Sequence, residues 1–225
     1  MLQLDSMERG LFESVECVRF DNCFIEQSTG GILGQPVNTI TNLSFIIVAL
    51  IIIFSLKTKM PKTQQILLGA ICAIIGLSSA YYHMTMTFLG QILDLTGMYM
   101  VAVFVICYAI MRWRQWGNRQ FWLAFILPLI PLLATLVFLP EIRNFVFAGV
   151  LLVGLVAEFV IGNKQKYDWR ILLGALGVLL VSFTIWLCDV NRIIDFNGHA
   201  LWHIFNGVAI LFLFIYYAKG SKIKQ

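Results

Sequence analysis

The sequence predicts an all-α, polytopic membrane protein, a bundle of seven transmembrane helices with the N-terminus outside and the C-terminus in the cytoplasm. Three observations support this. Of the 225 residues, 60% are hydrophobic and only 12% are charged, whereas about 25% of the residues of a soluble domain are charged. Seven apolar runs follow one another, each close to the roughly 20 residues that cross a bilayer. The basic residues gather in alternate connections between these runs.

The seven apolar runs define the expected helices in order. Asp94 and Glu158 are the only acidic residues within these runs. The connections between the runs are too short for a separate soluble domain. We therefore expect an amphipathic outer-face segment at 1–37, a seven-helix domain at 38–218 and a basic cytoplasmic tail at 219–225. The runs lie near residues 38–56, 66–84, 91–111, 121–139, 144–162, 171–188 and 199–218.

The distribution of basic residues predicts the orientation of the helices. Twelve Lys and Arg residues lie after the first, third, fifth and seventh runs, against four on the other side, and the more basic side of a membrane protein is cytoplasmic. The net charge of +4 is therefore a topology signal, and nucleic acid is not an expected partner. The twelve are Lys57, Lys59, Lys62, Arg112, Arg114, Arg119, Lys164, Lys166, Arg170, Lys219, Lys222 and Lys224, and the four are Arg9, Arg19, Arg143 and Arg192.

Glu158 lies toward the cytoplasmic end of the fifth run. A carboxylate there can reach the interface or pair with a nearby cation. If it pairs, we expect Lys164 or Lys166 as its partner; no catalytic role is expected for it.

The three histidines of the chain are expected to form a metal site. His83 ends the second run, and His199 and His203 begin the seventh. Because the second span runs outward and the seventh inward, all three lie near the outer boundary. His199 and His203 share one helix face at i and i+4, and a third imidazole leaves one position open, as in catalytic zinc sites. The alternative is that each histidine only forms hydrogen bonds between helices.

Asp94 and Ser79 are the candidate catalytic residues. Asp94 opens the third run on the same outer side, where a carboxylate could take a proton from the attacking water and return it to the leaving group. Its alternatives are a helix N-cap or a partner that orients a histidine. Ser79 shares a helix face with His83, so its hydroxyl could point at the same pocket or bond the carbonyl one turn back.

Together these motifs resemble those of the alkaline ceramidase family. The resemblance rests on the stretch SSAYYHMTMTFLGQILDLTGMY, which holds Ser79, His83 and Asp94, and on the distant HALWH. The run LGQPVNTITNLSF is similar to the entrance to the family's first helix. The family belongs to the CREST superfamily of seven-helix membrane hydrolases, which also includes the adiponectin receptors, and the resemblance covers nearly the whole chain.

The resemblance implies a zinc-dependent amidase that splits ceramide, or a related amide-linked lipid, into a free fatty acid and a long-chain amine. It implies zinc on His83, His199 and His203, with Asp94 and Ser79 at the remaining site positions. The expected partners are the lipid substrate and the membrane, while the acyl length and the oligomeric state are not indicated. The short loops suit a bacterial member, so a bacterial inner membrane is favoured over the endoplasmic reticulum or Golgi.

The resemblance also implies a calcium site in the N-terminal segment. Counting back from Asn38 places Asp21, Asn22 and Glu26 on the family's calcium pattern and Gln35 on a later Glu of that pattern. Two of the expected carboxylates are missing, whereas calcium requires six or more oxygen ligands. Asp21, Asn22 and Glu26 are thus the candidate ligands of a reduced calcium site.

A seven-helix receptor or transporter is the alternative function. Its histidines and Asp94 would then bind a ligand or relay protons. A retinal protein would need a Lys in the middle of the seventh run, which has none. A coupled transporter would usually place polar groups at the midplane, whereas here they gather at one end, which favours the hydrolase.

Overall fold

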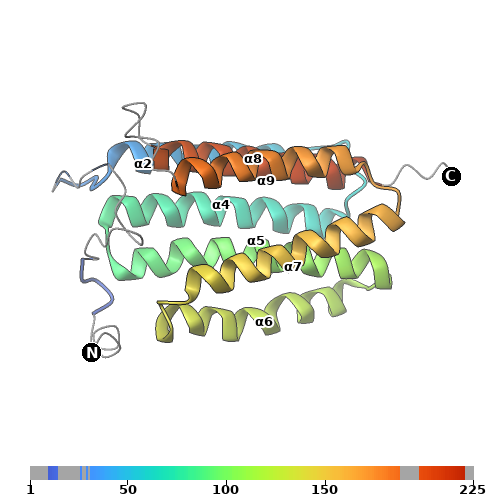
Figure 1. Cartoon of the computed structure of the whole chain (residues 1–225), viewed down its shortest axis with the longest axis horizontal. Coiled ribbons are helices and arrows are strands. Elements are labelled where there is room, and N and C mark those ends of the chain that lie inside the picture. The colour runs from blue at the N-terminus through green and yellow to red at the C-terminus, as the bar shows by residue number, and fades with distance from the viewer. Residues whose placement is uncertain (1–9, 15–25, 27–28, 30, 188–197, 221–225) are drawn as a thin grey trace.

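The computed structural model describes residues 10–14, 26, 29, 31–187 and 198–220, and this part of the chain is built from helices with one isolated β-bridge. The long helices lie side by side in an elongated bundle (Figure 1). This confirms the predicted all-α class. The helices are α2 (Pro36–Thr41), α3 (Leu43–Phe54), α4 (Lys62–Thr85), α5 (Phe88–Arg114), α6 (Asn118–Phe138), α7 (Arg143–Lys164), α8 (Trp169–Leu187) and α9 (Gly198–Lys219).

The helices follow the predicted apolar runs but differ from them at their ends. The first run is divided into α2 and α3 at Asn42, while α4 and α5 begin four and three residues before the predicted starts. Apolar composition marks the part of a helix that meets lipid. Polar residues such as Lys62 can continue the same helix into the interface, so the helix is longer than the run.

Six helices in the described part of the chain are long and apolar enough to cross a membrane, with α2 and α3 counted as one span. The protein is therefore an integral membrane protein. The remaining helix, α8, is apolar but shorter, with an apolar stretch of Trp169–Ile185. At 1.5 Å per residue its 19 residues extend about 28 Å, close to the roughly 30 Å of a hydrocarbon core. We propose that α8 is the seventh span.

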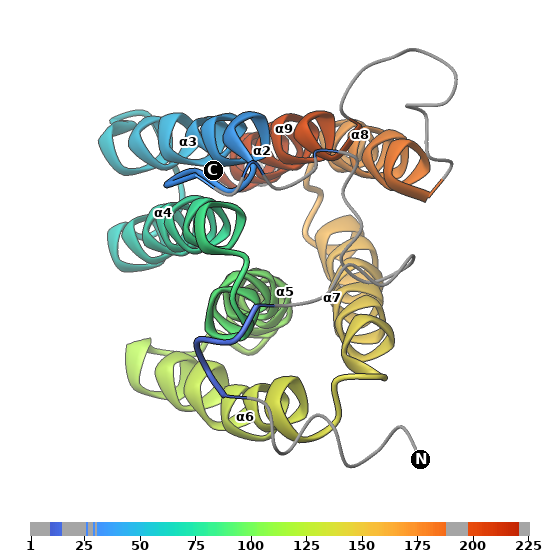
Figure 2. The same cartoon turned by 90° about the vertical axis from the view of Figure 1, so that its left-hand side faces the viewer.

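Helix α5 occupies the centre of the bundle. Viewed along the helices, α3, α9 and α8 form one row, α4, α5 and α6 form a second line, and α7 faces α5 from the other side (Figure 2). The contact between α4 and α5 depends on Gly97, because a Cβ there would lie 2.8 Å from Cγ1 of Ile75. Small residues let membrane helices approach closely in this way.

An ion pair between α5 and α7 accounts for the carboxylate inside the fifth run. Glu158 is fully buried and pairs with Arg112, and its Oε1 accepts a hydrogen bond of 2.9 Å from the hydroxyl of Tyr217 on α9. The expected pairing with Lys164 or Lys166 is therefore wrong. Arg112 comes from the helix packed against α7, whereas the two lysines lie at the end of α7 or beyond it. The Arg112 guanidinium also lies over the rings of Tyr108, Tyr167 and Tyr217.

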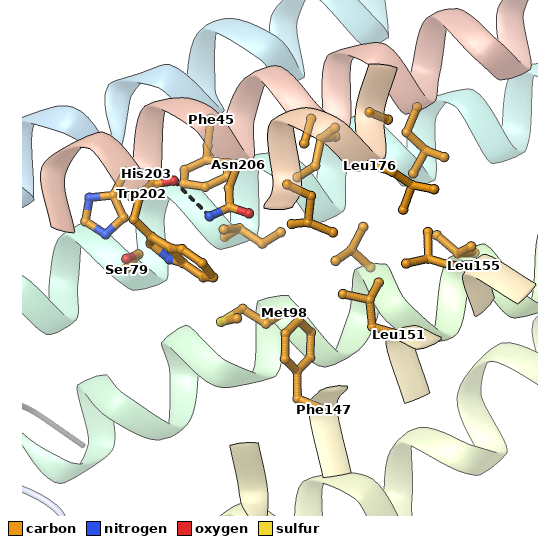
Figure 3. A pocket seen from close by; sticks show the side chains of 18 of the residues that line it. Phe45, Ser79, Met98, Phe147, Leu151, Leu155, Leu176, Trp202, His203 and Asn206 are labelled. Carbon is orange, nitrogen blue, oxygen red and sulfur yellow. Dashed lines mark hydrogen bonds between the residues drawn. The ribbon is translucent and has the colours of Figure 1, made fainter. Parts of the chain in front are cut away.

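A cavity lies between α5, α7, α8 and α9, and residues of α3 and α4 complete its wall. Its lining is mostly apolar. Polar side chains gather at one end of it, where Ser79, His203 and Asn206 are seen in Figure 3, and leucines line the other end. An apolar wall of this kind is a favourable environment for an aliphatic chain.

Candidate active site

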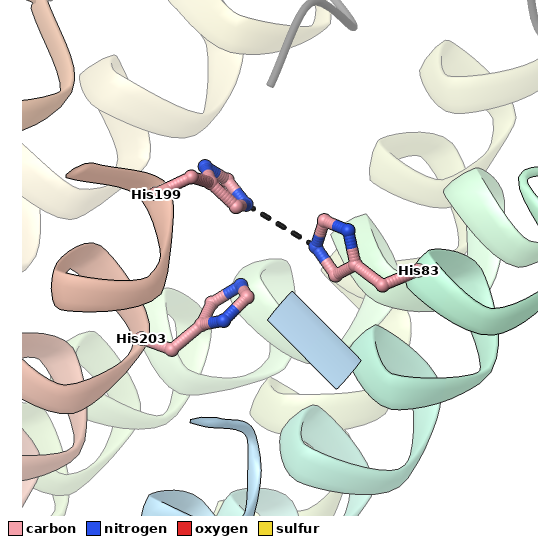
Figure 4. A group of neighbouring side chains, drawn as sticks. All are labelled: His83, His199 and His203. Atoms are coloured by element: carbon pink, nitrogen blue, oxygen red, sulfur yellow. Dashed lines mark hydrogen bonds between the residues drawn. The ribbon is translucent and has the colours of Figure 1, made fainter. Parts of the chain in front are cut away.

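The three histidines of the sequence meet at one end of the bundle. His83 comes from the last turn of α4, and His199 and His203 come from the first turns of α9 (Figure 4). One ring nitrogen from each lies within 4.8 Å of the other two. His83 and His203 are buried, with 0% and 2% of their surfaces exposed. The antiparallel course of α4 and α9 thus brings the three imidazoles to the same depth.

Gln35 determines which nitrogen His83 offers to this cluster. The Nδ1 of His83 lies 2.6 Å from Oε1 of Gln35. The orientation of the Gln35 amide follows from its other end, since its Nε2 donates to the carbonyl oxygen of Glu26 at 2.6 Å. An amide oxygen only accepts, so His83 donates through Nδ1. Its Nε2 is left with a lone pair that faces the cluster.

Thr41 does the same for His203. The Thr41 hydroxyl lies 3.0 Å from Nδ1 of His203 and 3.0 Å from the carbonyl oxygen of Val37. The carbonyl oxygen of Asn38 is also close to this hydroxyl, at 3.1 Å. A carbonyl cannot donate, so the single hydroxyl proton goes to these backbone oxygens and the hydroxyl oxygen accepts from His203. The Nε2 of His203 is therefore also unprotonated.

The segment before α2 positions Gln35 by pairing with the end of α4. The backbone N–H groups of Gly34 and Gln35 donate to the carbonyl oxygens of Met84 and His83, each at 2.9 Å. A Cβ at Gly34 would lie 3.0 Å from the Met84 oxygen and 3.1 Å from the His83 oxygen. Only glycine allows the two backbones to approach this closely, and the approach fixes Gln35 beside the His83 ring.

The cluster could hold a metal ion. The Nε2 atoms of His83 and His199 lie 3.2 Å apart, and two lone pairs at that distance require a proton or a cation between them. Tetrahedral ligands about 2.05 Å from one zinc ion lie roughly 3.3 Å apart. Neutral imidazoles whose second nitrogen is held by a hydrogen bond are typical zinc ligands. We propose His83, His199 and His203 as its ligands.

Ser79 and Asp94 lie together beside His203. All three line the cavity, and the side chains of Ser79 and Asp94 are close enough to interact. Asp94 lies seven residues into α5, and the residue that caps this helix is Thr87, whose side chain accepts from the Gly90 N–H. The cap alternative for Asp94 is therefore excluded. The neighbour of Ser79, Ser78, bonds a backbone carbonyl one turn back.

The proposed calcium ligands are only partly described. Asp21 and Asn22 lie outside the described residues. Glu26 is described, and its two carboxylate oxygens accept from the backbone N–H groups of Val37 and Asn38 at 2.7 and 2.8 Å. Glu26 thus caps the N-terminus of α2, a favourable place for a negative charge. Calcium binding by these residues stays a prediction.

Two residues of the site were missed by sequence reasoning. The sequence places Gln35 only in the calcium pattern and gives no role to Thr41. Both have a weak signal in the sequence, because Gln35, Asn38 and Thr41 repeat at intervals of three in front of an apolar run. That spacing also occurs in ordinary capped helices, so it did not single them out.

Comparisons with known proteins agree on one family. The sequence model of the family described as Ceramidase matches residues 32–222, which include every described residue of the site except Glu26. Alkaline ceramidases of two nematodes are similar to the chain. That of Caenorhabditis elegans is 26% identical over 204 residues, and that of Caenorhabditis briggsae is 27% identical over 206 residues. Each match covers 80% of this chain and 72% of the relative.

Proposed function

The chain belongs to the ceramidase family, and from this premise we propose that it cleaves the amide bond of ceramide or a related N-acyl lipid within the membrane. The protein is a hydrolase of linear amide bonds. The observation that carries the proposal is a buried cluster of three histidines at the polar end of an apolar cavity, next to Ser79 and Asp94. The products are a free fatty acid and a long-chain amine.

The metal of the site is proposed to be zinc, held by His83, His199 and His203. Three nitrogen ligands are typical of catalytic zinc, which keeps a further position open. When bound, the ion would supply the Lewis acidity that activates water and polarises the amide carbonyl. The protein contributes the tautomers of His83 and His203, through Gln35 and Thr41, and a site sheltered from bulk water.

Asp94 is proposed to move the proton during the reaction. Its carboxylate accepts a proton from the attacking water as the oxygen of that water bonds to the carbonyl carbon. When the carbon–nitrogen bond breaks, Asp94 returns the proton to the nitrogen, because an unprotonated amine is a poor leaving group. Ser79 lies beside Asp94 at the same end of the cavity, and its hydroxyl is proposed to orient the carboxylate.

The cavity accounts for a lipid substrate. Beyond the polar end its walls are mostly aliphatic and aromatic side chains of α5, α7, α8 and α9. An aliphatic chain in this space would contact only apolar atoms, which is the favourable environment for it. The reacting amide would then lie at the polar end, beside His203 and Asp94.

The membrane and compartment are proposed separately. The basic connections and the histidine cluster lie at opposite ends of the bundle, so we propose an active site on the outer face. A bacterial inner membrane stays a prediction that draws no support from the two nematode relatives. A receptor or transporter is not favoured, because the matched family consists of hydrolases.

Fatty-acid release tests the proposed function. Purified protein in detergent micelles, loaded with one equivalent of zinc, should release fatty acid from a short-chain fluorescent ceramide. The same protein treated with a chelator and His203→Ala should release none above background. A zinc-loaded protein that binds the lipid without hydrolysing it would contradict the proposal and favour a receptor.

A further inference from the structure

Asn206 is a polar residue of the cavity that the reaction described above does not use. It lies on α9, three residues after His203, and therefore on the same face of that helix. At 1.5 Å per residue it is about 4.5 Å deeper along the axis. Its side chain lines the cavity, between the polar end and the leucines beyond (Figure 3).

The orientation of the Asn206 amide is determined by its two hydrogen bonds. Its Nδ2 lies 2.8 Å from the carbonyl oxygen of Trp202 and 3.0 Å from Oγ of Ser182 on α8. A carbonyl oxygen only accepts, so the group beside Trp202 is the NH₂ group. The Ser182 hydroxyl donates to the same carbonyl at 3.3 Å, and so accepts from Asn206. Both protons of the amide are then used.

The oxygen of the same amide remains available in the cavity. Within the described part of the chain, Oδ1 of Asn206 accepts no hydrogen bond, and Figure 3 draws it pointing away from His203 toward the apolar end. An acceptor surrounded by apolar side chains is unfavourable unless a donor reaches it. A purely aliphatic chain offers none.

We infer that Asn206 is a specificity residue of the site, whose Oδ1 accepts a hydrogen bond from a hydroxyl group that the lipid carries next to its amide-bearing carbon. This rests on the proposed function. The leaving nitrogen must face Asp94, which returns the proton to it. A hydroxyl two carbons from that nitrogen is then the nearest substrate donor that can reach an acceptor one helical turn deeper.

A substrate that lacks this hydroxyl would leave Oδ1 unpaired. Leaving an acceptor unpaired inside an apolar cavity is costlier than replacing it with an apolar group of the same shape. We therefore expect kcat/KM to fall about 10-fold for a lipid that lacks the recognised hydroxyl. Asn206→Leu replaces the amide by an apolar side chain of similar shape, so the preference between the two lipids should disappear.

The test compares three lipids with the same acyl chain: N-acyl sphinganine, its 1-deoxy analogue and its 3-keto analogue. The wild type should hydrolyse the analogue that lacks the recognised hydroxyl with a kcat/KM about 10-fold lower than that of N-acyl sphinganine. In Asn206→Leu and Asn206→Ala the ratio of these two kcat/KM values should be near one. Thr184→Val is the matched control, because Thr184 is on α8 near Ser182 but is exposed and bonds Leu180. It should keep the wild-type ratio.

Two results would overturn the inference while leaving the proposed function intact. One is a wild type that hydrolyses all three lipids equally well. The other is an Asn206 variant that keeps the wild-type ratio. A ratio cancels any general loss of activity from altered packing, so a merely structural role of Asn206 would not change it. A wild type that hydrolyses none of the three would instead overturn the proposed function itself.

Discussion

The nitrogen that each histidine offers to the metal is determined by residues that are not themselves ligands. Gln35 and Thr41 occupy Nδ1 of His83 and His203, and neither bond is visible from the histidine spacing. Because imidazole has two similar nitrogens, a ring without such a partner would divide its population between two tautomers. The hydrogen bonds disfavour the tautomer that is protonated at Nε2, and so keep the Nε2 lone pair available for a metal.

Removal of a ligand should remove the metal. His199→Ala leaves two imidazoles, which bind zinc far more weakly than three, so we expect no bound zinc after dialysis. Elemental analysis of the purified protein measures this directly. Tyr81→Phe, a conservative change near His83, serves as the control and should keep one zinc per chain. Stoichiometric zinc in His199→Ala would show that the metal lies elsewhere.

Gln35→Leu and Thr41→Val should weaken zinc binding without abolishing it. Each change removes the acceptor of an Nδ1–H group, and loss of such a partner typically costs about 10- to 100-fold in metal affinity. Competition with a chromophoric chelator measures the dissociation constant. Thr39→Val is the control, because Thr39 bonds only a backbone carbonyl. Unchanged zinc affinity in both variants would mean that the tautomers are not limiting.

Asp94→Asn should keep zinc but lose activity by about 10²-fold or more, because the amide has the shape of the acid without its basicity. Ser79→Ala should cost less, since it removes a neighbouring hydroxyl and leaves the Asp94 carboxylate in place. Hydrolysis of a fluorescent ceramide, with zinc measured in parallel, gives both values. Ser78→Ala is the matched control and should be as active as the parent. An Asn variant with parental activity and full zinc would require another base.

At the level of secondary structure, helices α5, α7 and α9 are joined by a polar contact at the end of the bundle opposite the histidines. Glu158 bonds Arg112 on one side and Tyr217 on the other. A buried pair often contributes little net stability compared with apolar residues of similar size, but breaking it is unfavourable because one charge stays buried. The contact therefore constrains which helices can pack together.

Glu158→Leu should lower the stability of the protein by about 3–5 kcal/mol, because it leaves the Arg112 guanidinium buried without its anion. The double variant Arg112→Met/Glu158→Leu should recover most of this loss. Thermal unfolding in detergent gives the comparison, and zinc content should be unaffected. Lys164→Gln tests the partner expected from the sequence and should unfold at the parental temperature. A Glu158→Leu variant as stable as the parent would show that the ion pair is dispensable.

At the scale of the whole molecule, the two ends of the bundle differ in chemistry. The basic connections, including Lys57, Arg114 and Lys166, lie at one end, and the histidine cluster lies at the other. The excess of basic residues on one side orients membrane proteins, so the position of the active site relative to the membrane follows from the same charges.

The N-terminus should lie outside and the C-terminus in the cytoplasm. Reporter fusions at each end, one active only outside and one only inside, measure this. Replacing Lys57, Lys59 and Lys62 by Gln should weaken the preference for this orientation without changing the helices. This variant tests whether the basic residues set the orientation. A C-terminal reporter active only outside would reverse the proposed location of the active site.

The sequence by itself determined the class of the protein, the approximate positions of its helices and the three histidines. These properties follow from local composition and spacing: lipid requires long apolar helices, and an i, i+4 pair shares a face regardless of what packs against it. The expectation that His83 joins His199 and His203 also followed. Because successive spans alternate in direction, the end of the second span and the start of the seventh lie at the same depth in the membrane.

Only the tertiary structure decided which residues complete the site. Gln35 reaches His83 across 48 positions of the chain, Thr41 reaches His203 across 162, and Glu158 finds Arg112 rather than a nearby lysine. Such contacts depend on which helices become neighbours and how they are rotated about their axes. Helix order and hydrophobicity do not determine that rotation, because any apolar face of a helix can contact lipid. Close packing around residues such as Gly34 and Gly97 selects one arrangement.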